Sequence, residues 1–263
     1  MVPTASVVIM FVNAVIGIVV PVLLAWWMVR KHHAKWSTIL IGAATFFVFA
    51  LILESIVHQI VLRGPAGATI QGNTLYYALY GGLMAGLFEE TGRFLSMKFL
   101  MKKEPSSTLP ALAYGVGHGG MEVIVVFAVT MISQAVMALM INAGQTDMLT
   151  AHVDFDAKAQ MDAIFTQLEN AAPASFLLGL WERVSAVILH LSLSVLVWVA
   201  VRKAGKWLWL YPAAILLHAL VDGLTVVLSR SAGTLAIECI LLSMAVAIAA
   251  LAWLVARKAF RQA

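Results

Sequence analysis

Apolar residues form seven long runs along this chain, and the stretches between the runs are polar or contain glycine and proline. A helix of about 20 apolar residues crosses a hydrocarbon layer about 30 Å thick. The pattern therefore predicts an all-α fold, a polytopic transmembrane bundle of seven helices that forms a single domain over residues 1–263. The predicted spans are 5–29, 37–62, 75–100, 109–141, 174–200, 208–228 and 234–256.

Composition agrees with a membrane protein, since 62% of the residues are hydrophobic and 11% are charged, which excludes an ordinary soluble domain. The expected location is a bacterial cytoplasmic membrane, and the sequence does not indicate an oligomeric state. The net charge of +4 is explained by basic loops next to anionic cytoplasmic lipid. It therefore gives no reason to expect nucleic-acid binding.

Lysine and arginine gather in the loops at one side of the predicted bundle. Because basic loops resist translocation, this asymmetry predicts an N-terminus outside and a C-terminus in the cytoplasm. With that orientation, only Arg63, Lys158 and Arg230 lie outside. The cytoplasmic residues are Arg30, Lys31, Lys35, Lys98, Lys102, Lys103, Arg202, Lys203, Lys206, Arg257, Lys258 and Arg261.

One connection is long, and it runs over residues 142–173. Met161, Ile164, Phe165 and Leu168 recur there at helical spacing among acidic residues. The pattern predicts an extracytoplasmic amphipathic helix that lies across the outer mouth of the bundle. A solvated connector and a lid or docking element remain open as its role.

Many ionisable side chains fall inside the predicted spans. Each costs at least about 2.5 to 3.5 kcal/mol at the bilayer centre, so each needs a partner or a water-filled cavity. Scattered structural pairs could explain a few of them but not the whole set. The residues are Glu54, His58, Glu89, Glu90, Arg93, His118, Glu122, Glu182, Arg183, His190, His218, Asp222 and Glu238.

Four of these residues share one depth. Glu90, His118, His190 and His218 each lie about 10 residues from the cytoplasmic end of their span, which is about 15 Å at 1.5 Å per residue. Four helices therefore bring one glutamate and three histidines to a level close to the membrane midplane.

Helical spacing gives several of these groups a partner on the same face. Glu122 follows His118 by four residues, and Asp222 follows His218 by four. Arg93 follows Glu90 by three residues, where it can orient or neutralise the carboxylate. Arg183 precedes His190 by seven residues on the same face, whereas its neighbour Glu182 is rotated away from that face.

Glycines occur next to these polar groups. Gly82 and Gly86 precede Glu89 in a GxxxG pattern, and Gly117 and Gly119 flank His118. Small residues allow helix backbones to approach closely in membranes. We therefore expect the third and fourth spans to pack against each other, with room for a second chain.

Three imidazoles from separate helices together with carboxylates suit Zn²⁺, which catalytic sites hold by three protein ligands and one open position. A zinc-bound water has a pKa of about 7, and a nearby glutamate could take its proton during attack on a carbonyl. In a metal-free alternative, Glu90 activates water directly while histidines and Arg93 stabilise the oxyanion. Both routes lead to peptide-bond hydrolysis and both stay open.

These motifs resemble those of intramembrane peptidases. EETGR, residues 89–93, is similar to their E-E-x-x-[RK] motif, and GHGGMEV and HALVD are similar to their second and third motifs, in the same order. The chain resembles the YhfC family of membrane peptidases, in which a later E-R…H segment, here WERVSAVILH, also occurs. That family is similar to the PrsW peptidases and, more distantly, to the CaaX-protease and bacteriocin-processing enzymes.

The resemblance implies a seven-helix core and a functional role for the residues of the three motifs. Two features depart from the better-studied relatives, because the second motif carries both a histidine and a glutamate and because His190 has no counterpart in the three-motif pattern. The relatives' catalytic scheme therefore does not carry over whole. The implied residues are Glu89, Glu90, Arg93, His118, Glu122, His218 and Asp222.

Two other functions remain possible. The scaffold subunit of γ-secretase resembles the same superfamily and is not itself a peptidase, so this bundle could be a non-catalytic membrane scaffold or interaction protein. Intramembrane carboxylates and histidines also serve as proton relays in transporters. The sequence shows neither repeated halves nor paired interrupted helices, which argues against a proton-coupled transporter.

We predict an intramembrane peptidase that hydrolyses a peptide bond of a membrane-embedded or membrane-associated polypeptide. Glu90, supported by Glu89 and Arg93, is the predicted general base. The predicted zinc ligands are His118, His190 and His218, with Glu122 as a further ligand. Asp222, Glu182 and Arg183 are expected to support and orient the ligands.

Overall fold

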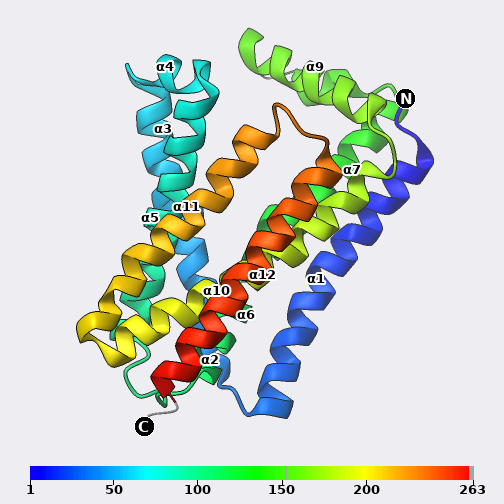
Figure 1. Ribbon diagram of the computed structural model, residues 1–263. Helices are drawn as coiled ribbons and strands as arrows, with labels where there is room; N and C mark the ends of the chain where they lie inside the picture. Colours follow the sequence, from blue (N-terminus) through cyan, green and yellow to red (C-terminus); the bar gives the residue numbers. More distant parts are fainter. Residues whose placement is uncertain (152, 261–263) are drawn as a thin grey trace. The chain divides into compact units, whose positions relative to one another are not determined.

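The computed structural model describes residues 1–151 and 153–260, and within these ranges the chain folds into helices without any β-strand (Figure 1). The predicted all-α class is confirmed. The longer elements are α1 (Thr4–His32), α2 (Trp36–Phe46), η1 (Phe47–Glu54), α3 (Ser55–Arg63), α5 (Thr74–Phe99), α6 (Leu109–Glu122), η2 (Val123–Ala128), α7 (Val129–Asn142), α9 (Phe155–Asn170), α10 (Ser175–Lys203), α11 (Leu210–Leu228) and α12 (Thr234–Phe260). Three short elements are α4 (Gly67–Gly72), α8 (Thr146–Thr150) and η3 (Gly205–Trp209).

Within the described ranges, six helical segments are long and apolar enough to cross a membrane, and the chain is a multi-pass integral membrane protein. The predicted span 75–100 corresponds to α5, which is not among the six. Glu89, Glu90 and Arg93 fall within this helix and lower its mean hydropathy. The six segments are Thr4–His32, Trp36–Arg63, Leu109–Asn142, Ser175–Lys203, Gly205–Leu228 and Thr234–Phe260.

The chain divides into two compact units. Unit 1 comprises Met1–Val20 and Val123–Arg183, and unit 2 comprises Pro21–Glu122 and Val184–Ala263. Glu182 and Arg183 belong to unit 1. All the other candidate site residues belong to unit 2.

In unit 1, hydrogen bonds join the chain start to the end of α7. The side chain of Asn142 accepts from the Val2 backbone N–H at 2.7 Å and donates to the Val2 carbonyl at 2.9 Å. Helix α9 lies in the segment where the amphipathic helix was expected, and it buries Phe165 and Leu168.

In unit 2, an apolar core joins α5, α6, α10, α11 and α12. Its most deeply buried side chains include Met97, Tyr114, Leu196 and Trp198, all of which are at most 1% exposed. The Trp198 indole N–H donates to the Ser107 carbonyl at 2.8 Å, so this buried ring has no unsatisfied donor. The core fixes the four helices that carry the candidate histidines and glutamates.

Glycines bring particular helix pairs of unit 2 close together, but not the pair that the sequence suggested. A Cβ atom at Gly82 or Gly86 would meet backbone oxygens of α11, so these glycines allow α5 and α11 to lie side by side (Figure 1). A Cβ atom at Gly117 would meet the Ile39 carbonyl of α2. The expected glycine contact between the third and fourth spans is therefore wrong, because Gly82 and Gly86 face the sixth span, Gly117 faces the second, and Gly119 faces His190 of the fifth.

Two segments of the long helices have π-helical geometry. η1 continues α2 and ends at Glu54, and η2 begins directly after Glu122. In η1, the Phe49 ring covers Gly92 of α5, where a side chain larger than hydrogen would overlap it. π-helical turns shift the faces of a helix and are frequent near functional sites.

Candidate metal centre

Three histidines and Glu89 converge within unit 2, and each comes from a different helix. Glu89 lies on α5, His118 on α6, His190 on α10 and His218 on α11. The ring centroids of His118 and His190 are 5.1 Å apart, and those of His190 and His218 are 5.5 Å apart. All four residues are at most 7% exposed.

Glu89 occupies the space between the imidazoles. Its Oε2 atom lies 2.8 Å from His118 Nε2 and 3.8 Å from His190 Nδ1, whereas its Oε1 atom lies 4.0 Å from His218 Nε2. One carboxylate therefore faces a ring nitrogen of every histidine in the cluster.

Glu90 has a different environment from Glu89, although the two residues are adjacent. Its Oε1 atom forms an ion pair with Arg93 and also lies 2.9 Å from His218 Nδ1. Glu90 and Arg93 are both fully buried. A carboxylate held in this way is suited to positioning its neighbours.

Arg93 also links this pair to His190, because its Nη2 atom lies 3.1 Å from His190 Nδ1. A guanidinium can only donate, so His190 Nδ1 accepts and the proton of the neutral ring stands on Nε2. That Nε2 atom faces a carboxylate oxygen of Glu122. The tautomer of His190 is thus set from both sides.

Asp222 stands at the edge of the cluster. Its Oδ2 atom lies 3.5 Å from His218 Nε2, one helical turn away. Its side chain is 41% exposed, far more than that of any histidine in the cluster. Glu182 and Arg183 form an ion pair with each other on the α10 segment of unit 1.

Two aromatic residues pack against His118, and neither was predicted from the sequence. The Tyr114 ring stacks on His118 with centroids 5.8 Å apart, and Phe46 approaches the imidazole edge-on at 5.2 Å. The Ser96 hydroxyl donates to the Tyr114 oxygen at 3.1 Å. Tyr114 precedes His118 by four residues, so helical spacing could have identified it.

The donor set fits a zinc ion. One ligand atom each from Glu89, His118 and His190 lies within 4.8 Å of the other two, and all three residues are buried. Two imidazole nitrogens and one carboxylate oxygen are ordinary zinc donors. Glu122 on the far nitrogen of His190 matches the carboxylate that commonly supports a metal-binding imidazole. Arg93 would compete with a cation for the His190 Nδ1 lone pair.

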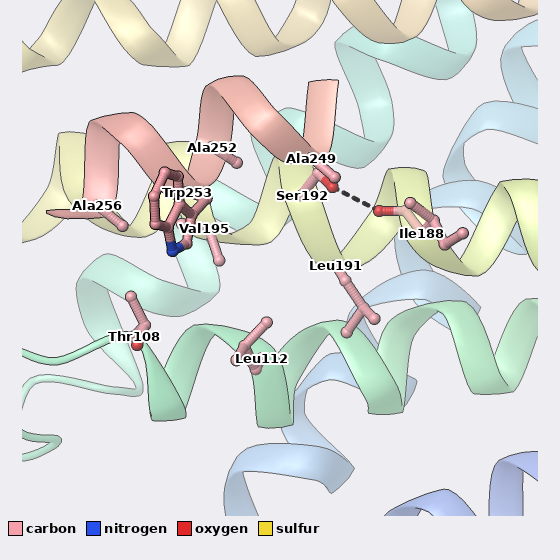
Figure 2. Close-up of a pocket in the computed structure, with 10 residues that line it drawn as sticks. All are labelled: Thr108, Leu112, Ile188, Leu191, Ser192, Val195, Ala249, Ala252, Trp253 and Ala256. Carbon is pink, nitrogen blue, oxygen red and sulfur yellow. Dashed lines mark hydrogen bonds between the residues drawn. The ribbon is translucent and has the colours of Figure 1, made fainter. Parts of the chain in front are cut away.

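An apolar groove of about 300 Å³ lies between α6, α10 and α12, and its lining includes Leu112, Val195 and Ala252 (Figure 2). The Ser192 hydroxyl in this groove donates to the Ile188 carbonyl of its own helix at 2.6 Å (Figure 2). Among the described residues that line the groove, none is charged and none is a histidine. This lining therefore includes none of the candidate catalytic or metal-binding residues.

Comparison with known proteins gives two matches. The family described as YhfC intramembrane metalloprotease matches residues 16–243. The chain is also 39% identical over 223 residues to the "Uncharacterized membrane protein YhfC" of Bacillus subtilis (strain 168), and the match covers 84% of each chain. No solved structure matches the chain significantly.

Proposed function

The chain belongs to the YhfC intramembrane metalloprotease family, and from this premise we propose that it hydrolyses a peptide bond of a membrane-embedded or membrane-associated polypeptide. The observation that carries the proposal is the position of Glu89 between three histidines from three other helices. A buried carboxylate among ring nitrogens can accept a proton from water and orient that water for attack on a carbonyl.

Glu89 is the proposed general base in place of Glu90, which the sequence had suggested. The Oε2 atom of Glu89 faces His118 and His190, where it would be the metal ligand, and this leaves Oε1 to take the proton of the attacking water. His218 Nε2 lies 4.0 Å from Oε1, so the protonated His218 ring can give its Nε2 proton to the leaving nitrogen across the same space. Glu90 and Arg93 act as positioning residues, because Glu90 holds His218 Nδ1 and Arg93 holds Glu90.

Glu89, His118 and His190 are the residues that would hold a metal ion, and zinc fits their donor types. When bound, zinc would polarise the substrate carbonyl and lower the pKa of water. Glu122 would orient His190 through its Nε2 atom. We therefore propose that Glu122 supports the ligand His190 and does not itself bind the metal. Asp222 would support His218 in the same way.

The proposal includes seven spans, with α5 as the seventh. At 1.5 Å per residue its 26 residues extend about 39 Å, which is enough to cross a bilayer. Glu89, Glu90 and Arg93 of α5 are buried within unit 2. Gly82 and Gly86 pack along α11, one of the apolar spans. With seven spans and basic loops on one side, the N-terminus would be outside and the C-terminus in the cytoplasm, in the cytoplasmic membrane of a bacterium.

Mapping of new polypeptide termini across a whole membrane fraction tests this function, because it requires no chosen substrate. Membranes from cells that express the wild type are compared with membranes that contain Glu89→Gln, and Glu104→Gln is the matched control outside the cluster. The proposal predicts termini within or beside membrane-spanning segments in the wild type and the control, and their loss in Glu89→Gln. Identical termini in all three samples would support a non-catalytic scaffold.

A further inference from the structure

A second set of polar side chains lies beside the candidate metal centre. His58 Nδ1 is 2.9 Å from the Tyr80 hydroxyl, and His58 Nε2 is 3.1 Å from Glu54 Oε1. η1 also packs against α5 near Glu89, because the Phe49 ring lies against Gly92, and Asp222 of α11 lies 3.5 Å from His218. These groups come from η1, α3, α5 and α11, and the hydrolytic scheme above assigns a role only to Asp222 and Glu89.

The set lies toward one end of unit 2. Helices α5 and α11 run antiparallel, since Gly82 faces Ala219 and Gly86 faces Ile215. The start of α5 and the end of α11 therefore meet at the end where α4 connects α3 to α5, here called the α4 end. Tyr80 is six residues from the start of α5 and Asp222 is six residues from the end of α11, so both lie about 9 Å from the α4 end.

These side chains are more exposed than the three histidines of the cluster, which are at most 4% exposed. The Glu54 side chain is 10% exposed, that of His58 is 32% and that of Asp222 is 41%. A carboxylate in a membrane-spanning helix is costly if it faces lipid. An aspartate with this exposure at this depth therefore faces water.

The core on the other side of the cluster is apolar. Away from the α4 end it contains Met97, Met101, Leu193, Leu196 and Trp198, and each is at most 1% exposed. Closely packed apolar side chains disfavour water between them. We therefore expect water to reach Glu89 from the α4 end.

We propose that Asp222, Glu54 and His58 line a hydrated path that leads from the α4 end of the bundle to Glu89 and supplies the water consumed in hydrolysis. The path rests on the proposed peptidase function. It passes from Asp222 to His218 at 3.5 Å and from His218 to Glu89 at 4.0 Å. Tyr80 fixes the ring of His58 at the wall of this path.

Cysteine labelling with a charged, water-soluble methanethiosulfonate reagent tests the path. The thiolate is the reactive form, and it forms in water and not in lipid. In a Cys239→Ala background, Asp222→Cys is compared with Leu220→Cys on the same helix. Leu220 is 55% exposed as a whole residue, so simple exposure would favour its labelling. The path predicts that Asp222→Cys reacts about tenfold faster or more.

A second pair on another helix keeps the test independent of one variant. His58→Cys is compared with Ile60→Cys. The native Ile60 is apolar and is 69% exposed. Ser231→Cys in the loop after α11 and Lys103→Cys after α5 report which side of sealed vesicles the reagent reaches. The path predicts that Asp222→Cys and His58→Cys react from the same side as Ser231→Cys.

Equal rates within both pairs, or reaction of Asp222→Cys only from the side of Lys103→Cys, would overturn the path. If one path variant fails to fold, the other pair decides the result. The labelling requires no turnover and no substrate. Fast labelling in a protein without peptidase activity would therefore support the path and reject the proposed function. Slow labelling in an active peptidase would reject the path and support the proposed function.

Discussion

Nε2 of His118 lies 2.8 Å from Oε2 of Glu89, although the two residues are 29 positions apart in the chain. This contact joins α6 to α5 at the depth where His190 and His218 arrive from two further helices. It also gives the two carboxylate oxygens of Glu89 different surroundings, because Oε2 contacts His118 and Oε1 faces His218.

The zinc content of variants should depend on Glu89, His118 and His190, and not on every histidine of the protein. We expect His118→Ala and His190→Ala to purify without stoichiometric zinc, because each variant removes one of three ligands. Glu122→Gln should bind zinc about 10 to 100 times more weakly, since it loses the support of His190. Elemental analysis of purified protein measures this, with His58→Ala as the control that retains the metal. Full zinc in His118→Ala would remove that residue from the site.

Substitution of Arg93 should destabilise the protein strongly. Arg93→Met leaves the Glu90 carboxylate buried without its counter-charge, which costs about 3 to 5 kcal/mol of unfolding free energy. The double variant Glu90→Met with Arg93→Met should recover part of this loss, because no charge is then left unpaired. Denaturation in detergent measures both values. A double variant as unstable as the sum of the two single variants would contradict the coupling.

Two adjacent glycines in α5 should respond differently to alanine. A Cβ atom at Gly82 would overlap the Ala219 carbonyl, whereas one at Gly81 would meet nothing within 4 Å. Gly82→Ala should therefore lower the stability by about 1 to 3 kcal/mol, and Gly81→Ala should change it little. The same detergent denaturation compares the pair. Equal effects would mean that α5 and α11 do not pack at this register.

Glu90→Gln tests whether Glu90 positions its neighbours or acts as the general base. The variant weakens the ion pair with Arg93 and the contact with His218, so it should be less stable. It keeps Glu89, His118 and His190, so it should retain the metal and a measurable rate of cleavage. Complete loss of cleavage in a folded, metal-loaded Glu90→Gln protein would restore the base role that the sequence suggested for Glu90.

Much of the fold and part of the site could be predicted from the sequence. Long apolar runs specify membrane helices because the bilayer fixes their length, and six of the predicted spans coincide with apolar helices of that length. The shared depth of His118, His190 and His218 follows from the constant rise of a helix. The i to i+4 spacing of His218 and Asp222 likewise corresponds to a contact in the structure.

Other features could not be predicted, because periodicity gives the faces of a helix but not its neighbours. Glu89 and Glu90 differ by about 100° around α5, and only the packing decides which one faces the three histidines. The same ambiguity explains why the glycines of α5 meet α11 and not the fourth span. The π-helical geometry of η2 directly after Glu122 has no clear signal in the sequence.

Restoration of activity by metal addition tests the central claim most directly, namely that Glu89, His118 and His190 form one hydrolytic metal centre. The purified wild type is stripped with a chelator, reconstituted in vesicles with a membrane polypeptide identified by the terminus mapping, and assayed before and after zinc is added. We expect cleavage to disappear on chelation and return with zinc in the wild type, and to stay absent in Glu89→Gln. Cleavage that persists without metal, or that zinc restores equally in Glu89→Gln, would contradict the account.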